Sequence, residues 1–308
     1  MAHANNNNAY QMVTDRIVEM MNKGIIPWRK PWHFGAIDDG QEQAISYTSR
    51  RAYSLLNQWL LGEPGEYLTF NQIKERGGYI RKGEKARMVV FFKQMSYTET
   101  NADGEEEIKT YPLLRWYNVW HINQTEGIPS KIPATPEAEV VKPSGPEAIN
   151  EAEAIILAYL QREASLKFQN DKPSGSAYYS PSKDEVVVPM LSQYDNAAEY
   201  YSTTFHELTH STLKASRCNR VAENTRAFFG NADYSREELV AEMGAAMLVS
   251  HSGIDNAAAF KNSVAYIQNW IASLKNDPKM IVWAASRAEK AARYIIGGPE
   301  AIKPAEQA

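Results

Sequence analysis

The spacing of apolar residues predicts a mixed first half, with helices followed by strands. Residues 9–23 place Met12, Val13, Ile17 and Met20 at helical intervals. Thr69, with Gln72 three residues later, predicts the start of another helix that ends at the Gly77-Gly78 pair. We therefore expect helices over residues 9–23, 50–61 and 69–77. They precede strand-like runs over 86–97 and 110–122, which the acidic stretch 98–109 joins as a solvated hairpin loop.

The second half has mainly helical periodicity. The apolar pattern predicts helices over residues 147–167, 197–214, 235–251, 257–275 and 278–296, and the pair Gly297-Gly298 ends the last. A short strand is expected over residues 184–189. The predicted fold class is α+β, with a mixed α/β first domain and a mainly helical second domain.

A proline-rich segment separates the two halves. Residues 129–146 contain five prolines and no aromatic residue, which is typical of an extended linker. The chain has 308 residues, and domains usually have about 100–200 residues. We therefore expect domains at 1–128 and 147–308, joined by the linker 129–146.

Composition indicates a globular cytoplasmic protein. The chain is 44% hydrophobic and 23% charged, and it has no apolar run of the roughly 18 residues that a membrane helix requires. Its N-terminus lacks the pattern of a signal peptide. The single cysteine, Cys218, permits no internal disulfide, which favours a reducing compartment. The net charge of −4 argues against a globally basic surface but permits a local one.

The motif His206-Glu207-Leu208-Thr209-His210 predicts a zinc site. Residues four apart lie on one face of a helix, so His206 and His210 can bind the same ion. Glu207 can reach a water bound to that ion and act as the base in peptide hydrolysis. The alternative is an amphipathic helix with two ordinary histidines.

A later helix is expected to supply the third ligand. Glu238 and Glu242 share a face in a stretch rich in small residues, where unpaired carboxylates would be costly to bury. We assign Glu238 as the ligand and Glu242 as the acceptor that orients a ligand histidine. The alternative is a solvated carboxylate face that includes Glu237. Cys218 and His251 are the less favoured ligands.

The strand around Val186-Val187-Val188 precedes the motif. As a sheet edge it would suit an extended peptide substrate, whereas packing alone would equally explain its apolar residues.

The first half combines aromatic and basic residues. Five of the seven tryptophans lie within residues 1–128, and the segment from Lys74 to Lys93 has seven basic and two acidic residues, a net charge of +5. Bases of single-stranded DNA stack on aromatic rings while cations contact the phosphates. The alternative is a core of aromatics with a solvated charged face. The candidate DNA-binding residues are Trp28, Arg29, Lys30, Trp32, Arg81, Lys82, Lys85, Arg87, Arg115, Trp116 and Tyr117.

Across both halves the sequence resembles the ArdC-type antirestriction proteins of plasmids and phages. In the first half the resemblance rests on Pro27–Arg29, residues 68–72, residues 77–85, residues 89–92 and residues 114–120. In the second half it rests on Tyr178–Asp184, Val187–Pro189, the motif 206–210, Ser216-Arg217 and residues 237–242. Departures occur at Ser211, at Cys218-Asn219 and over residues 36–44.

The resemblance implies a single-stranded-DNA-binding domain followed by a zincin-like metallopeptidase domain. It implies zinc held by His206, His210 and Glu238, with Glu207 as the base, and a role in guarding entering plasmid or phage DNA from host restriction. The protein or peptide substrate is left open. Two alternatives stand beside this reading: a non-catalytic protein that coats single-stranded DNA and uses zinc structurally, and a protease acting on covalent protein–DNA adducts.

Overall fold

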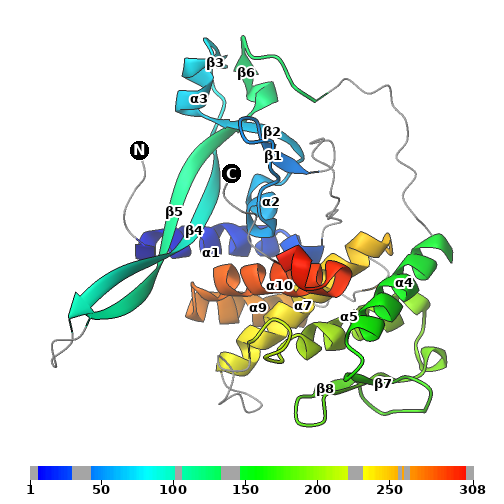
Figure 1. The fold of residues 1–308 in the computed structure, drawn as a ribbon. Coiled ribbons are helices and arrows are strands. Elements are labelled where there is room, and N and C mark those ends of the chain that lie inside the picture. Colours follow the sequence, from blue (N-terminus) through cyan, green and yellow to red (C-terminus); the bar gives the residue numbers. More distant parts are fainter. Residues whose placement is uncertain are drawn as a thin grey trace. The chain divides into compact units, whose positions relative to one another are not determined.

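The computed structural model describes residues 6–29, 43–100, 106–132, 146–220, 232–255, 259 and 264–302 (Figure 1). The chain forms two compact units, one of residues 1–19 and 37–134 and the other of residues 20–36 and 135–308. Helix α1, Asn6–Asn22, therefore contributes to both. Among the described helices, none combines the length and apolar character needed to cross a membrane. The predicted α+β fold with two parts is confirmed.

A four-stranded sheet forms the centre of the first unit. Its strands are β1 (Ala44–Ser46), β2 (Gly65–Thr69), β4 (Arg87–Thr100) and β5 (Glu106–His121), in the order β1-β2-β5-β4. The β1–β2 pair is parallel and the other two pairs are antiparallel. Tyr67, Val89 and Val119 pack with residues of β1 and of helix α2, Leu55–Leu61, on one face.

Helix α3, Phe70–Glu75, begins where the sequence predicts. The Thr69 hydroxyl accepts from the Gln72 backbone N–H, and the Gln72 side chain accepts from the Thr69 N–H, forming a capping box. The chain then forms β3 (Tyr79–Ile80), which pairs with β6 (Thr125–Glu126); the short helix η2, Ile122–Gln124, directly precedes β6.

Two elements of this unit differ from the predicted ranges. Helix α2 begins at Leu55 rather than residue 50, because Arg50 has a φ of 58°, outside the right-handed helical region. Strands β4 and β5 pair as far as Thr100 and Glu106, so the hairpin is longer than expected and residues 98–100 and 106–109 are strand. Only residues 101–105 of the predicted loop remain, and these lie outside the described part of the chain.

The start of the predicted linker packs on the first unit. The buried carboxylate of Glu66 accepts hydrogen bonds from the Ser130 hydroxyl and the Lys131 backbone N–H, and it pairs with Arg50. Residues 129–132 are therefore held in place, while residues 133–145 lie outside the described residues.

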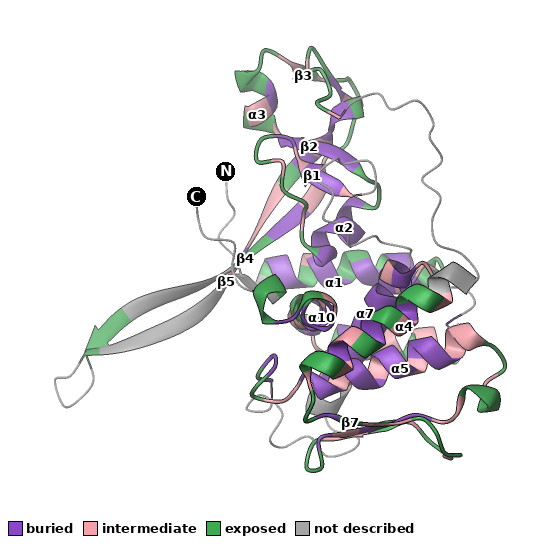
Figure 2. Cartoon of the chain, turned by 45° about the vertical axis from the view of Figure 1, so that its right-hand side comes forward, coloured by how far each residue is buried: buried purple, intermediate pink, exposed green. Residues whose placement is uncertain are grey.

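Helices dominate the second unit. They are α4 (Pro146–Arg162), α5 (Ala197–Ser211), α7 (Ala232–Ser252), α9 (Val264–Asn276) and α10 (Met280–Gly297), with short 3-10 turns at η1 (Pro27–Arg29), η3 (Leu191–Gln193) and η4 (Pro299–Ile302). Helix α7 is buried along most of its described length (Figure 2).

A three-stranded sheet flanks these helices. It consists of β7 (Lys167–Gln169), β8 (Tyr178–Ser180) and β9 (Glu185–Val187), in the order β7-β9-β8. The strand predicted from Val186-Val187-Val188 is therefore central, which favours packing over the alternative of a sheet edge. Its two neighbours explain the continuous apolar run, because both faces and both edges of β9 are covered.

Small residues allow α5 and α7 to approach closely. A Cβ atom added at Gly244 would lie 2.6 Å from Thr209 Cγ2, so a side chain larger than hydrogen does not fit there. Thr209 lies on α5 between the two motif histidines. The contact brings the start of α7, which carries Glu237 and Glu238, against the motif helix.

Residues 20–29 belong to the second unit, although the proline-rich boundary predicts them in the first domain. Arg29 forms a buried ion pair with Glu242 of α7 and lies over the ring of Tyr266, with 4.3 Å between its guanidinium carbon and the ring centroid. Trp28 is 1% exposed. These residues belong to the second unit because η1 packs against helix α7.

Candidate metal centre and nucleic-acid interface

Two helices bring three candidate metal ligands together. The Nε2 atoms of His206 and His210 are 3.1 Å apart. Glu238, from α7, places Oε2 at 3.5 Å from His206 Nε2 and Oε1 at 3.4 Å from His210 Nε2. The structure thus brings together the three residues that the sequence predicts as ligands.

The spacing of these atoms fits a small divalent metal. A tetrahedral zinc ion with bonds of about 2.0–2.2 Å holds its ligand atoms roughly 3.3–3.6 Å apart. The two imidazole nitrogens are 3.1 Å apart, and each lies 3.4–3.5 Å from a different oxygen of the Glu238 carboxylate, so one ligand atom from each residue lies within 4.8 Å of the others. Two imidazoles and one carboxylate also form a donor set used by catalytic zinc, with a fourth position left for water.

Glu207 lies beside this group in a buried position. It is 7% exposed, and the backbone N–H of Tyr179 on β8 lies near its carboxylate and favours its charged form. Burial raises the pKa of Glu207 above its ordinary value, and the neighbouring His206 and His210 partly oppose this. A carboxylate with a raised pKa is suited to accept a proton near neutral pH.

Glu237, rather than Glu242, contacts a ligand histidine. Glu237 Oε1 lies 3.4 Å from His210 Nδ1, the ring nitrogen that faces away from the group. Glu242 instead pairs with Arg29 and accepts a hydrogen bond from Tyr266. Glu237 therefore has the contact with His210 that was predicted for Glu242, while Glu242 contacts Arg29 of η1 and Tyr266 of α9.

Arg220 holds Glu237 in this position. Its guanidinium contacts Glu237 Oε1 at 2.9 Å and also donates to the Thr212 hydroxyl and the Thr209 carbonyl. Burial would raise the pKa of Glu237, but Arg220 and His210 hold it below its ordinary value. Burial would also lower the pKa of His210, whereas hydrogen bonds with Glu237 and Glu238 raise it to about 10. A metal ion must therefore displace a proton from this ring.

Replacing Glu237 by Gln is expected to lower metal affinity about 10- to 100-fold, the usual effect of losing a group that orients a ligand histidine. The matched control is Glu242→Gln, on the same helix but paired with Arg29, which should leave the affinity unchanged. Competition with a chromophoric chelator measures both. A larger loss for Glu242→Gln would contradict the assignment.

The less favoured ligands lie outside this group. Cys218 is buried, and its sulfur contacts the Lys290 carbonyl at 4.0 Å. His251 lies in the last turn of α7, more than three turns beyond Glu238.

The predicted DNA-binding residues fall into three classes: an exposed basic group, a half-buried group on β5, and residues that have other partners or lie outside the described part of the chain. Arg81, Lys82 and Lys85 are exposed on the segment between β3 and β4, where Gly83 has a φ of 91°. We call these three residues the basic loop. Arg115, Trp116 and Tyr117 are half-buried on β5.

The remaining candidates are occupied elsewhere or lie outside the described residues. Trp28 is a core residue and Arg29 is ion-paired, so neither presents a surface to DNA in this structure. Arg87 pairs with Glu63 and donates to the Leu61 carbonyl and the Tyr67 hydroxyl. Lys30 and Trp32 lie outside the described residues.

Exposed aromatic residues outside the predicted DNA-binding set lie near the basic loop in the chain. Tyr79, the first residue of β3, is 60% exposed. Phe70 is 55% exposed, and its ring centroid lies 6.4 Å from that of Trp120. Phe91 and Phe92 are also exposed. Adjacent residues of a strand face opposite sides, so the apolar pair Phe91-Phe92 was a signal that one ring at least would lie outside a one-sided core.

Family comparisons match both halves of the chain. Residues 7–120 match the N-terminal domain of the anti-restriction factor ArdC, and residues 153–287 match a zincin-like metallopeptidase family. Protein y4eC of Sinorhizobium fredii strain NGR234 is 28% identical over 297 residues, covering 93% of this chain and 91% of that protein. The Escherichia coli DNA primase TraC is 27% identical over 304 residues, covering 93% of this chain but 20% of the primase.

Two crystal structures of antirestriction protein ArdC from plasmid R388 share this fold. The metal-free structure has a TM-score of 0.64 at 29% identity, covering 96% of this chain and 99% of that one. The Mn(II)-bound structure has a TM-score of 0.62, covering 96% and 98%. A zincin-like domain and a metal-bound relative together indicate that this protein holds a metal ion. With its N-terminal ArdC domain followed by a zincin-like metallopeptidase domain, this chain belongs to the ArdC-type antirestriction family.

Proposed function

We propose that this protein binds single-stranded DNA through its first unit and hydrolyses peptide bonds at a zinc site in its second unit. Together these activities protect DNA of a plasmid or phage from host restriction as it enters the cell. The observation that carries the peptidase part of the proposal is that His206, His210 and Glu238 offer ligand atoms within 4.8 Å of one another, with Glu207 beside them.

In this proposal His206, His210 and Glu238 hold the metal, and the residues around them place the reacting groups. A bound zinc ion would polarise the substrate carbonyl and lower the pKa of a water molecule. Glu207 accepts the proton of the attacking water and later returns it to the leaving amine. Its burial restricts the carboxylate, and the nearby backbone N–H of Tyr179 favours its charged form.

Strand β8 is suited to bind an extended peptide. It lies at the edge of its sheet, and its Tyr179 N–H reaches Glu207. An edge strand binds an extended peptide by backbone hydrogen bonds, which select little on side chains. We therefore propose that an unfolded segment or loop of a protein is the substrate.

The basic loop and the exposed aromatics support the DNA-binding half. Arg81, Lys82 and Lys85 can contact phosphates, and Phe70 and Tyr79 offer rings on which unpaired bases can stack. Arg81 lies 3.7 Å from Glu126, with both side chains half-exposed, so that surface ion pair competes only weakly with a phosphate.

A restriction challenge in cells tests the proposal. Cells with a restriction system receive DNA as a single strand and carry the wild-type protein, the Glu207→Ala variant or a variant with the basic loop reversed to Glu. We expect both variants to lose protection, because one lacks hydrolysis and the other lacks DNA binding. Variant levels and metal content, measured in the same cells and on purified protein, control for folding.

The same experiment distinguishes this proposal from the alternative that the protein only coats DNA. If Glu207→Ala protects as well as the wild type while the loop reversal does not, the protein protects by coating DNA and the metal serves the fold. If neither variant affects protection, both halves of the proposal fail.

A further inference from the structure

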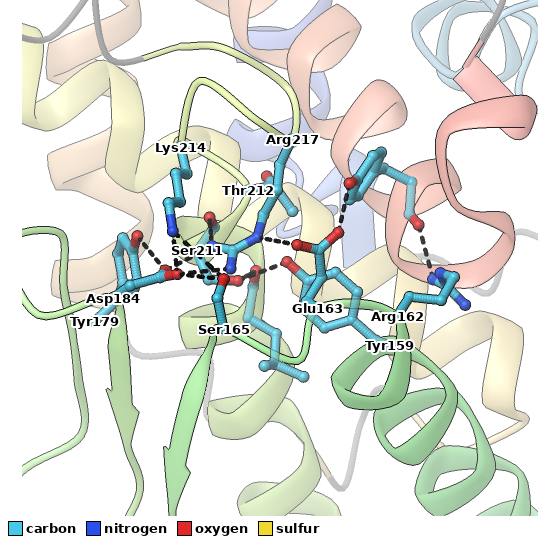
Figure 3. Close-up of polar contacts among 12 residues, drawn as sticks. Tyr159, Arg162, Glu163, Ser165, Tyr179, Asp184, Ser211, Thr212, Lys214 and Arg217 are labelled. Carbon is cyan, nitrogen blue, oxygen red and sulfur yellow. Dashed lines mark hydrogen bonds and ion pairs between the residues drawn. The ribbon is translucent and has the colours of Figure 1, made fainter.

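Two sequence stretches that the family resemblance singled out meet in one buried polar network. They are Tyr178–Asp184, which spans β8 and the turn after it, and Ser216-Arg217, which follows the motif helix α5. Figure 3 shows Arg217 between the carboxylates of Asp184 and Glu163. The Arg217 side chain is fully buried, at 0% exposure. Neither stretch supplies a metal ligand or the base.

Arg217 joins three elements of the second unit. Its two terminal nitrogens contact Asp184 Oδ1 at 2.7 Å and Oδ2 at 2.9 Å, a two-point contact that fixes orientation as well as distance. Its Nε donates to Glu163, just beyond the end of α4, at 2.8 Å. Nη1 also donates to the Ser211 carbonyl at the end of α5, at 2.8 Å, one residue after ligand His210.

Asp184 links Arg217 to the edge strand β8. It accepts a hydrogen bond from the Tyr179 hydroxyl at 3.1 Å and pairs with Lys214 at 2.5 Å. Its φ of 48° is a left-handed conformation that a non-glycine residue adopts only where its surroundings demand it. Burial would raise the pKa of Asp184, but hydrogen bonds from Arg217 and Lys214 hold it well below its usual range, so the ion pair persists at neutral pH.

Tyr179 connects the network to the reacting groups. Its hydroxyl donates to Asp184, and its backbone N–H lies close enough to the Glu207 carboxylate to favour the charged form of that group. The same residue therefore touches the network and the proposed base. A shift of β8 relative to α5 would move the peptide-binding edge and the N–H on Glu207 together.

We propose that Arg217 is a positioning residue of the peptidase site, which sets strand β8 against helix α5 by way of Asp184 and Tyr179. This inference rests on the proposed peptide-hydrolysing function. Arg217 does not touch His206, His210 or Glu238, so its contribution lies in peptide binding and in the placement of Glu207. A residue that only stabilised the fold would leave both of these unchanged in the folded variant.

Paired substitutions separate positioning from stability. Tyr179→Phe removes one hydroxyl that donates to Asp184, on the side of β8. Tyr294→Phe, the matched control, removes one hydroxyl that donates to Glu163, on the side of α10. Arg217→Met removes the whole link, and Arg217→Lys keeps a charge but lacks the planar fork that contacts both oxygens of Asp184. Tyr179→Phe keeps the test valid if Arg217→Met does not fold.

The first measurement is amide hydrogen exchange of the full-length protein over residues 176–184. We expect faster exchange in Arg217→Met and Tyr179→Phe, an intermediate rate in Arg217→Lys, and the wild-type rate in Tyr294→Phe. Wild-type exchange in both Arg217→Met and Tyr179→Phe would overturn the proposal.

The second measurement compares two inhibitors of the zinc-loaded protein, acetohydroxamate and a tripeptide hydroxamate, by competition binding. Their affinity ratio isolates the contribution of the peptide. We expect the wild-type preference for the tripeptide to fall about tenfold in Arg217→Met, since small displacements of a positioning group have effects of at least that size. An unchanged ratio would overturn the proposal. If the wild type itself shows no preference, the proposed peptide substrate is wrong, and hydrogen exchange alone decides the role of Arg217.

Discussion

Replacing His210 by Ala is expected to lower zinc affinity about 10²–10³-fold. Structural zinc sites with four ligands bind with about 10–16 kcal/mol, and each 1.4 kcal/mol is a factor of ten, so the loss of one ligand's quarter of that energy has this effect. In the proposed site His210 is one of three protein ligands, and its Nε2 lies 3.1 Å from that of His206 and 3.4 Å from the carboxylate of Glu238. Isothermal titration of the purified full-length protein measures the loss.

The matched control is His251→Ala, a histidine of the same unit that lies outside the ligand group. It should bind zinc as the wild type does. Because the pKa of His210 is raised to about 10, binding at neutral pH should also release a proton, and affinity should increase with pH. Equal affinity for wild type and His210→Ala would place the metal elsewhere.

Replacing all three residues of the basic loop by Ala is expected to weaken binding to single-stranded DNA about 10²-fold at 0.1 M salt. Each phosphate contact on a single strand contributes about 0.7 to the slope of log affinity against log salt, so three lost contacts reduce the slope by about 2. Fluorescence anisotropy across a salt series gives both quantities.

The control removes the same number of positive charges from the second unit, through Lys167→Ala, Lys172→Ala and Lys183→Ala, all of which are exposed. It should leave affinity and slope close to those of the wild type. If the two triple variants bind alike, the charge contribution is global and the basic loop is not the contact surface.

Local signals in the sequence predicted most of the helices and the centre of the metal group. The capping box at Thr69 and the four-residue spacing of His206 and His210 depend on neighbours in the chain, so they can be read directly. Glycine and alanine residues near Glu238 correctly indicated a close helix contact, which Gly244 makes with Thr209.

The features that the sequence did not predict depend on partners far along the chain. Glu242 has the helical position of a residue that could orient a ligand, yet its partner Arg29 lies 213 residues away. Trp28 belongs to an aromatic and basic cluster typical of DNA binding, but η1 buries it in the second unit. Strand β8, which lies outside the predicted elements, has three residues and is defined by its pairing with β9.

The enzymatic proposal depends most directly on Glu207. The decisive measurement is cleavage of a mixed-sequence peptide library by the zinc-loaded full-length protein in the presence of single-stranded DNA, with new termini identified by mass spectrometry. We expect metal-dependent cleavage that falls about 10²–10⁴-fold in Glu207→Gln, the usual contribution of a general base, while zinc content stays the same. Equal cleavage by Glu207→Gln, or no metal-dependent cleavage by the wild type, would contradict the account.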